Sequence, residues 1–199
     1  MDLHDTPGSS RRRGSALESA ILSAAWDQLV AGGYAGFTFD AIAVRARTSK
    51  PVLYRRWSSR IELLTAAIGF QGARDRIPSP DTGALRGDVL TLLREVNARP
   101  DRVLALFSAM AGGLYEQADL TPTTIRQHYL PTGSTEMERI VTRAVTRGEI
   151  PDAAVGPEIA GIPVELLRIR IFMRLGSLRD DELVAIVDDV FLPIVSKPV

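Results

Sequence analysis

The segment TSKPVLYRRW, residues 48–57, gathers residue types that bind anions and flat apolar rings. It holds three cations, two aromatic residues and one proline in ten positions. Lys50 can donate hydrogen bonds to guanine O6 and N7, and the two arginines can pair with phosphates. The apolar groups of Pro51 and Val52 can pack on the methyl group of thymine. This chemistry suits a nucleic acid.

The same segment reads as a short helix. Ser49 is a suitable N-cap, and Pro51 in the first turn removes only an amide that has no partner within the helix. Leu53 and Trp57 lie four residues apart, so both would face inward. The first turn, with its lysine and proline, would then face outward.

A second short helix is expected just before it, with Thr38 as N-cap. The three residues Ala46, Arg47 and Thr48 join the two, which predicts a helix-turn-helix. In that motif the second helix enters the major groove of DNA. The residues expected to face base edges or the flanking phosphates are Lys50, Pro51, Val52, Tyr54, Arg55, Arg56 and Arg60.

Three of these features have plainer interpretations. Tyr54 could be a half-buried aromatic that only packs, and Arg55 could be a solvated surface charge. Arg11–Arg13 could enter the minor groove as a basic arm, or could only be a solubilising run.

The distribution of charge agrees with a basic module at the N-terminal end. Residues 1–60 hold nine Lys or Arg and five Asp or Glu, a balance of +4. The whole chain of 199 residues is neutral, so residues 61–199 carry −4. Such asymmetry suggests one part that meets a polyanion and one that does not, although chance could also produce it.

Other classes of function find little support. The chain has no cysteine, which excludes disulfides and thiolate metal sites. His4 and His128 are far apart, and we find no catalytic motif, so we expect no catalytic residues, metal or cofactor and no enzyme. We find no secretory signal or apolar run of membrane-spanning length, and expect a cytoplasmic, nucleoid-associated protein without membrane contact.

The rest of the chain reads as helix after helix. Apolar spacing and capping signals predict helices over 84–97, 101–116, 137–147 and 157–175, and one from 180 onward. We expect an all-α protein of about nine helices. Its expected parts are a flexible basic arm (1–14), a helix-turn-helix domain with a fourth connecting helix (15–69) and a second helical domain (70–199).

Residues 18–68 resemble the DNA-binding domain of a TetR-family transcriptional regulator. The first two helices and the Gly-Tyr turn between them resemble ILSAAWDQLVAGGYAGFTFDAIA. The recognition helix, with the family's Leu-Tyr pair, resembles SKPVLYRRW, and the start of the fourth helix resembles SSRIELLTAAI. One position departs from the family, which has glycine in the turn where this chain has Arg47. Arginine there implies a different turn geometry or a small strain.

The resemblance implies a homodimer that binds a palindromic DNA operator. It implies base contacts from the first turn of the recognition helix, phosphate contacts from Tyr54, Arg56 and Arg60, and a cap at Thr38 near the DNA backbone. The expected DNA-binding residues are Thr38, Ser49, Lys50, Pro51, Val52, Tyr54, Arg55, Arg56 and Arg60.

The second domain would bind an effector and dimerise. Apolar residues of two central helices could line a ligand cavity, or could be ordinary core: Phe107, Met110, Leu114, Tyr115, Ile125 and His128. By resemblance, two apolar stripes near the C-terminus would pair with a second subunit, although use within the chain is also open: Ile162, Leu166, Ile169, Phe172, Leu183, Ile186, Val187, Val190 and Phe191.

Three functions remain to be compared. The first is a dimeric TetR-type repressor released by a small apolar or amphipathic ligand. The second is a DNA-binding protein of the same fold that is controlled by a partner protein or by its abundance. The third, an α-helical enzyme with an accidental helix-turn-helix pattern, is disfavoured because no catalytic set is found.

Overall fold

The computed structural model describes the backbone of residues 7–75, 77–116, 131–151 and 155–196, and their side chains except at 7–14, 113–116 and 131–135. Within these ranges the chain forms helices and no strand, which confirms the predicted all-α class. Its residues fall into two compact units. Unit 1 comprises residues 1–75 and 108–121, and unit 2 comprises residues 76–107 and 122–199.

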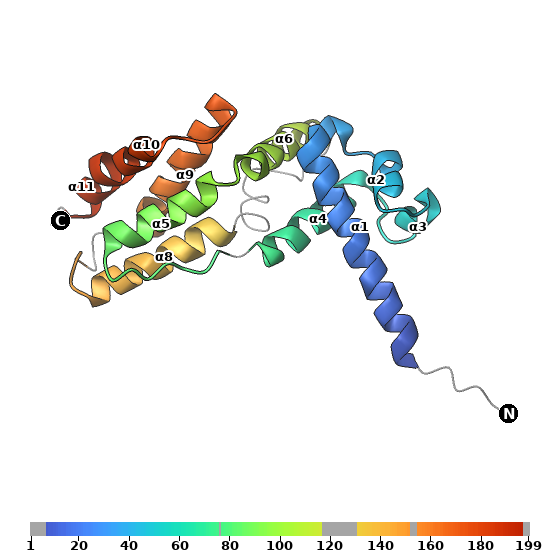
Figure 1. Ribbon diagram of the computed structural model, residues 1–199, viewed down its shortest axis with the longest axis horizontal. Helices are drawn as coiled ribbons and strands as arrows, with labels where there is room; N and C mark the ends of the chain where they lie inside the picture. Colours follow the sequence, from blue (N-terminus) through green and yellow to red (C-terminus); the bar gives the residue numbers. More distant parts are fainter. Residues whose placement is uncertain (1–6, 76, 117–130, 152–154, 197–199) are drawn as a thin grey trace. The chain divides into compact units, whose positions relative to one another are not determined.

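Unit 1 contains α1 (Pro7–Gly36), α2 (Phe39–Arg45), α3 (Lys50–Tyr54) and α4 (Arg60–Arg74). Helix α1 packs on α2 and α4, and α2 packs on α3 (Figure 1). Helix α6 (Pro100–Glu116) contributes its residues from Ser108 onward to this unit.

Helix α1 begins at Pro7, so the arm predicted over residues 1–14 is helical from residue 7 onward. Proline is tolerated in a first turn, and nothing between Pro7 and Ser15 breaks the helix strongly. Gly33 has φ of 58° and ψ of −168°, so the backbone is interrupted there before α1 ends at Gly36.

The core of unit 1 joins α1 to the two short helices. Ile21 and Leu29 from α1, Ile42 from α2, Leu53 from α3 and Leu63 from α4 are all fully buried. Trp57 is buried as well, which confirms the predicted inward face of the α3 segment. This apolar anchor fixes α3 from one side only and leaves its first turn at the surface.

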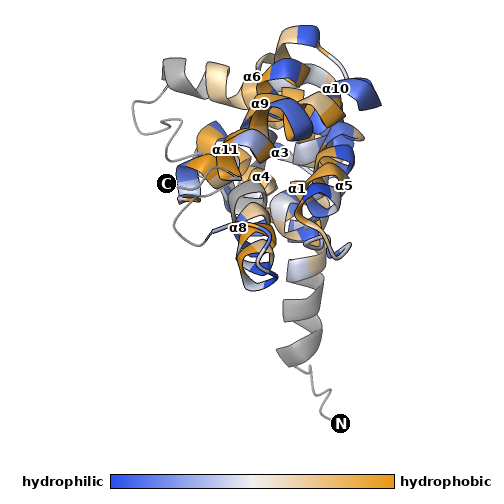
Figure 2. Cartoon of the chain, turned by 90° about the vertical axis from the view of Figure 1, so that its left-hand side faces the viewer, coloured by the Kyte–Doolittle hydropathy of each residue, from blue (hydrophilic) through white to orange (hydrophobic). Residues whose placement is uncertain are grey.

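Unit 2 contains α5 (Leu85–Asn97), α8 (Pro131–Thr146), α9 (Pro157–Arg174), α10 (Asp180–Ala185), the π-helical η2 (Ile186–Phe191) and α11 (Leu192–Val195). Helix α5 packs on α8, α9 and α10, and η2 packs on α9 and α5. Figure 2 shows apolar residues in orange along α9 and α11. No helix among the described residues is long and apolar enough to cross a membrane.

The π-helical turns have a local cause. The amide of Leu192 bonds to the carbonyl of Val187, five residues back. Pro193 follows, and a proline has no N–H to donate while its ring crowds the carbonyl four residues earlier. The turn before Pro193 therefore widens.

Candidate nucleic-acid interface

The turn between α2 and α3 is a Schellman motif with an arginine at its left-handed position. The amide of Thr48 donates to the carbonyl of Ala43 at 3.0 Å, and the amide of Arg47 donates to Val44 at 3.1 Å. This is the hydrogen-bond pattern that usually has glycine at the residue of positive φ. Arg47 has φ of 50°, so the turn keeps its geometry and the backbone strain falls on a residue that has a Cβ.

The start of each short helix is as the sequence predicts. Thr38 caps α2, since its hydroxyl accepts a hydrogen bond from the amide of Ala41 at 3.2 Å. Ser49 is the N-cap residue of α3, although its side chain makes no capping hydrogen bond. Pro51 lies in the first turn of α3 and is exposed, and Val52 is partly buried.

Lys50, the first residue of α3, forms an ion pair with Asp40 of α2. The ammonium nitrogen lies 2.5 Å from a carboxylate oxygen, and the two side chains are 46% and 73% exposed. The hydrogen bond to Asp40 raises the pKa of Lys50. Sequence analysis missed Asp40, although its place in the first turn of α2 could have suggested it.

Tyr54 both packs and remains accessible. Its ring lies parallel to that of Phe39, with 4.4 Å between the ring centres, and the residue is 55% exposed. Because Phe39 is buried, the tyrosine ring is held against the domain. Arg55, beside it, is exposed.

Two predicted phosphate contacts have partners inside unit 1. Arg56 forms an ion pair with Glu18 of α1 at 2.9 Å. The guanidinium of Arg60 lies over the ring of Tyr34, 4.0 Å from its centre. Contact with a phosphate would require each guanidinium to leave or share these partners, so that role stays a prediction.

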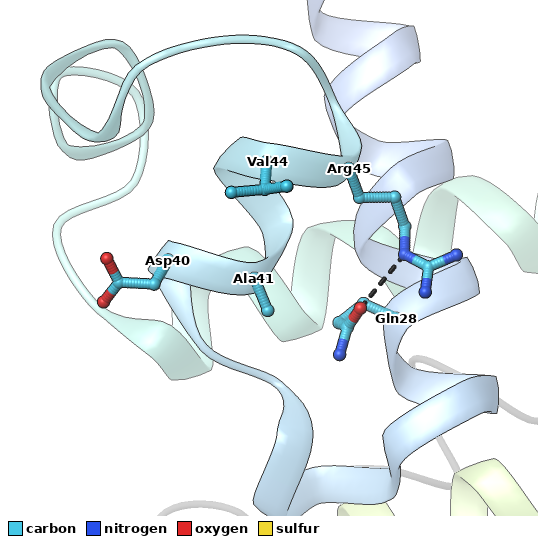
Figure 3. Close-up of a pocket in the computed structure, with 5 residues that line it drawn as sticks. All are labelled: Gln28, Asp40, Ala41, Val44 and Arg45. Atoms are coloured by element: carbon cyan, nitrogen blue, oxygen red, sulfur yellow. Dashed lines mark hydrogen bonds between the residues drawn. The ribbon is translucent and has the colours of Figure 1, made fainter.

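Arg45 is a further cation of this region that sequence analysis did not select. Its Nε donates to the amide oxygen of Gln28 at 3.0 Å, and the Gln28 amide nitrogen donates to the carbonyl of Gly36 at 3.0 Å. The two side chains line an open pocket over α1 and α2 (Figure 3). Its other lining residues are Asp40, Ala41 and Val44. Gln28 therefore orients the guanidinium group of Arg45.

Only part of the predicted ligand cavity can be compared with the structure. Phe107 stacks on Phe172 within unit 2, with ring centres 4.6 Å apart, and Met110 is partly buried. The side chains of Leu114 and Tyr115 lie outside the described part, as do Ile125 and His128. The cavity stays a prediction.

The apolar stripes near the C-terminus divide into two groups. Leu183, Ile186, Val187 and Phe191 are buried in the core of unit 2, so they serve the intrachain use that the sequence left open and are closed to a second subunit. Of the other predicted interface residues, Ile169 and Phe172 are exposed. Three more are partly buried: Ile162, Leu166 and Val190.

The hydrophobic effect drives this burial, and two exposed ion pairs agree with the orientation of the segment. Arg86 of α5 pairs with Asp188 at 2.7 Å, and Arg94 of α5 pairs with Asp180 at 2.7 Å. These pairs hold the acidic side of α10 and η2 next to α5. The apolar stripe of the same segment then enters the core with Phe191.

Comparison with known families agrees with this arrangement. The model of the bacterial regulatory proteins of the tetR family matches residues 21–67, which include α2 and α3. The model of the tetracyclin repressor-like C-terminal domain matches residues 79–190, more than half of the chain. The chain belongs to the TetR family.

Relatives of this TetR-family chain extend over nearly its whole length. A DNA-binding transcriptional repressor TetR of Mycobacteroides abscessus is 32% identical over 92% of this chain and 96% of its own. An uncharacterized HTH-type transcriptional regulator of Mycobacterium tuberculosis is 30% identical over 90% of this chain and 88% of its own.

Solved structures share the fold of this TetR-family chain. A TetR-family transcriptional regulator from Mesorhizobium loti superposes with a TM-score of 0.70 at 17% identity, covering 93% of this chain and 99% of its own. One from Rhodococcus sp. gives a TM-score of 0.66 at 22% identity, covering 92% and 100%. The chain is a TetR-family transcriptional regulator with an N-terminal helix-turn-helix domain and a C-terminal helical domain.

Proposed function

We propose that this protein is a repressor that binds a palindromic operator as a homodimer and acts at the nucleoid in the cytoplasm. The observation that supports it most is the exposed first turn of α3, anchored from behind by the buried Leu53 and Trp57. Lys50 and Pro51 then face base edges. Tyr54, Arg55 and Arg45 lie at the surface where phosphates would run.

Binding of the purified protein to duplexes from its own upstream region tests this proposal. Wild type should bind selectively, and the logarithm of its affinity should fall linearly with the logarithm of salt concentration. Lys50→Ala should relax base preference. Arg45→Ala should weaken binding to all duplexes and lower the salt slope by about 1, as expected for one lost phosphate contact.

Arg179→Ala is the matched control, because it removes one exposed cation from unit 2 whose ion-pair partner, Asp181, is exposed as well. It should change neither base preference nor salt slope. If wild type binds no genomic duplex selectively, the repressor proposal is wrong.

We propose further that a small apolar or amphipathic ligand, bound by the C-terminal domain, releases the DNA. The match of residues 79–190 to a tetracyclin repressor-like domain supports this. A ligand that prefers the form unable to bind DNA would lower DNA affinity and raise the melting temperature of the free protein. A thermal-shift screen, followed by DNA binding with each stabilising compound, measures both. A screen without such a compound would favour control by a partner protein.

A further inference from the structure

The Lys50–Asp40 pair lies where the proposed function needs positive charge, yet half of it is negative. Asp40 projects from α2 with 73% of its side chain exposed, beside the first residue of the recognition helix. A carboxylate at this place repels the phosphates of an approaching duplex. The Asp40 carboxylate therefore lowers the general affinity for DNA, and its position beside the recognition helix needs a different explanation.

Stability is a weak explanation for the pair. Exposed ion pairs contribute little because water and salt screen them and two flexible side chains must be ordered. An acidic residue in the first turn of α2 also interacts favourably with the helix dipole, but this effect does not require contact with α3. The contact across two helices is what remains to be explained.

The hydrogen-bonding groups of the pair match one base pair in the major groove. A G·C pair presents two acceptors, guanine N7 and O6, followed by one donor, the N4 amino group of cytosine. An ammonium has three donors, so Lys50 can bond to its carboxylate partner and still donate to both guanine acceptors. A carboxylate has only acceptors, so Asp40 can accept from cytosine N4.

The same pair suits the A·T edge less well. That edge runs acceptor, donor, acceptor and then the thymine methyl group. Two donors and one acceptor in sequence, as Lys50 and Asp40 offer them, would leave adenine N6 facing a cation. Thymine would also place its O4, an acceptor, opposite the carboxylate, with the methyl group next to it.

We propose that Asp40 and Lys50 together read one G·C base pair in each half of the operator, and that Asp40 is a specificity-determining residue. This inference rests on the proposed DNA-binding function. In it, Lys50 supplies attraction and Asp40 rejects base edges that offer no donor at the neighbouring position.

Selection from a randomised duplex library, followed by affinity measurements on single-position variants of the selected site, tests this. Wild type should require G·C at one position per half-site and lose about tenfold in affinity when A·T replaces it. Asp40→Ala should weaken that requirement at this position alone, while its binding to random duplex becomes tighter. Lys50→Met should lose the requirement and bind all duplexes more weakly.

Asp27→Asn serves as the control, because it removes one exposed carboxylate from α1 of the same unit. It should leave the G·C requirement unchanged. If Asp40→Ala selects the same site with the same discrimination at every position, Asp40 reads nothing and the inference is wrong. If wild type selects no site at all, the proposed function fails as well, so the two failures are distinguishable.

Discussion

At the scale of single residues, Arg47 shows how a turn can keep its shape with an unfavourable residue. Its φ of 50° lies in the left-handed region, which costs a residue with a Cβ about 1–2 kcal/mol. Glycine adopts this conformation freely but loses about 0.5–1 kcal/mol more chain entropy on folding. Arg47→Gly should therefore stabilise the protein by about 0.5–1 kcal/mol, measured by urea denaturation.

Arg47→Ala separates the backbone from the side chain in this test. Alanine removes the charge but keeps the Cβ, so it should not reproduce the gain in stability. Equal stabilisation by both variants would show that the arginine side chain, and not its backbone conformation, is unfavourable. Sequence analysis could mark this position because the departure from glycine is local, whereas the sign of φ required the structure.

At the scale of elements, the helix starts of unit 1 were predictable because their signals lie within a few residues. Thr38, Ser49 and Pro51 mark the starts of α2 and α3, and the structure confirms these positions. Contacts between residues distant in sequence were not predictable in this way. Nothing near Arg60 indicates that its guanidinium will lie over the ring of Tyr34.

The contact of α6 with the end of α1 is another long-range feature. A Cβ built on Gly112 would lie 1.9 Å from the Cδ1 of Tyr34, and the amide of Tyr34 donates to the hydroxyl of Ser108 at 2.6 Å. The absence of a side chain at Gly112 thus leaves room for a tyrosine ring. Gly112→Ala should destabilise unit 1 by about 1–3 kcal/mol, because the ring must move.

Gly72→Ala is the matched control for this prediction. It makes the same change within α4, where a Cβ would meet nothing within 4 Å. Alanine there should stabilise the helix by up to about 1 kcal/mol. Thermal or urea denaturation of both variants measures the difference, and equal effects would contradict the close contact with Tyr34.

The start of α10 depends on one carboxylate. Glu182 accepts from the Arg174 guanidinium at 2.6 and 2.7 Å and from the Arg179 amide at 2.9 Å, and these bonds lower its pKa from 4.5 to about 2. The stabilisation is therefore complete above about pH 4.5 and is lost as the pH falls toward about 2. Glu182→Gln should melt at a lower temperature than wild type at pH 7.

The pH dependence identifies the cause of that difference. The gap in melting temperature between wild type and Glu182→Gln should narrow between about pH 4.5 and about pH 2, where the glutamate takes up its proton. A gap that is the same at pH 7 and at pH 3 would contradict the role of the charged carboxylate.

At the scale of the whole molecule, the proposed homodimer needs an apolar surface on unit 2. The end of α9 offers one, since Met173 is 76% exposed and Leu175 is 73% exposed, beside the exposed Ile169 and Phe172. Leu175 also has a positive φ of 56° at the end of the helix. Sequence spacing predicted Ile169 and Phe172 but not the two neighbours, which lie off the periodic stripe at the helix end.

An exposed apolar surface of this kind suits a two-fold interface in which the same residues meet from both subunits. Met173→Lys places a charge on it without disturbing the core, so it should shift the protein from dimer to monomer in light scattering. DNA affinity should then fall far more for an operator with two half-sites than for a single half-site, because the two recognition helices no longer bind as a linked pair.

Glu138→Lys on α8 is the control, because it introduces the same lysine at an exposed position and should leave the dimer intact. A Met173→Lys protein that remains dimeric would place the interface elsewhere on the chain.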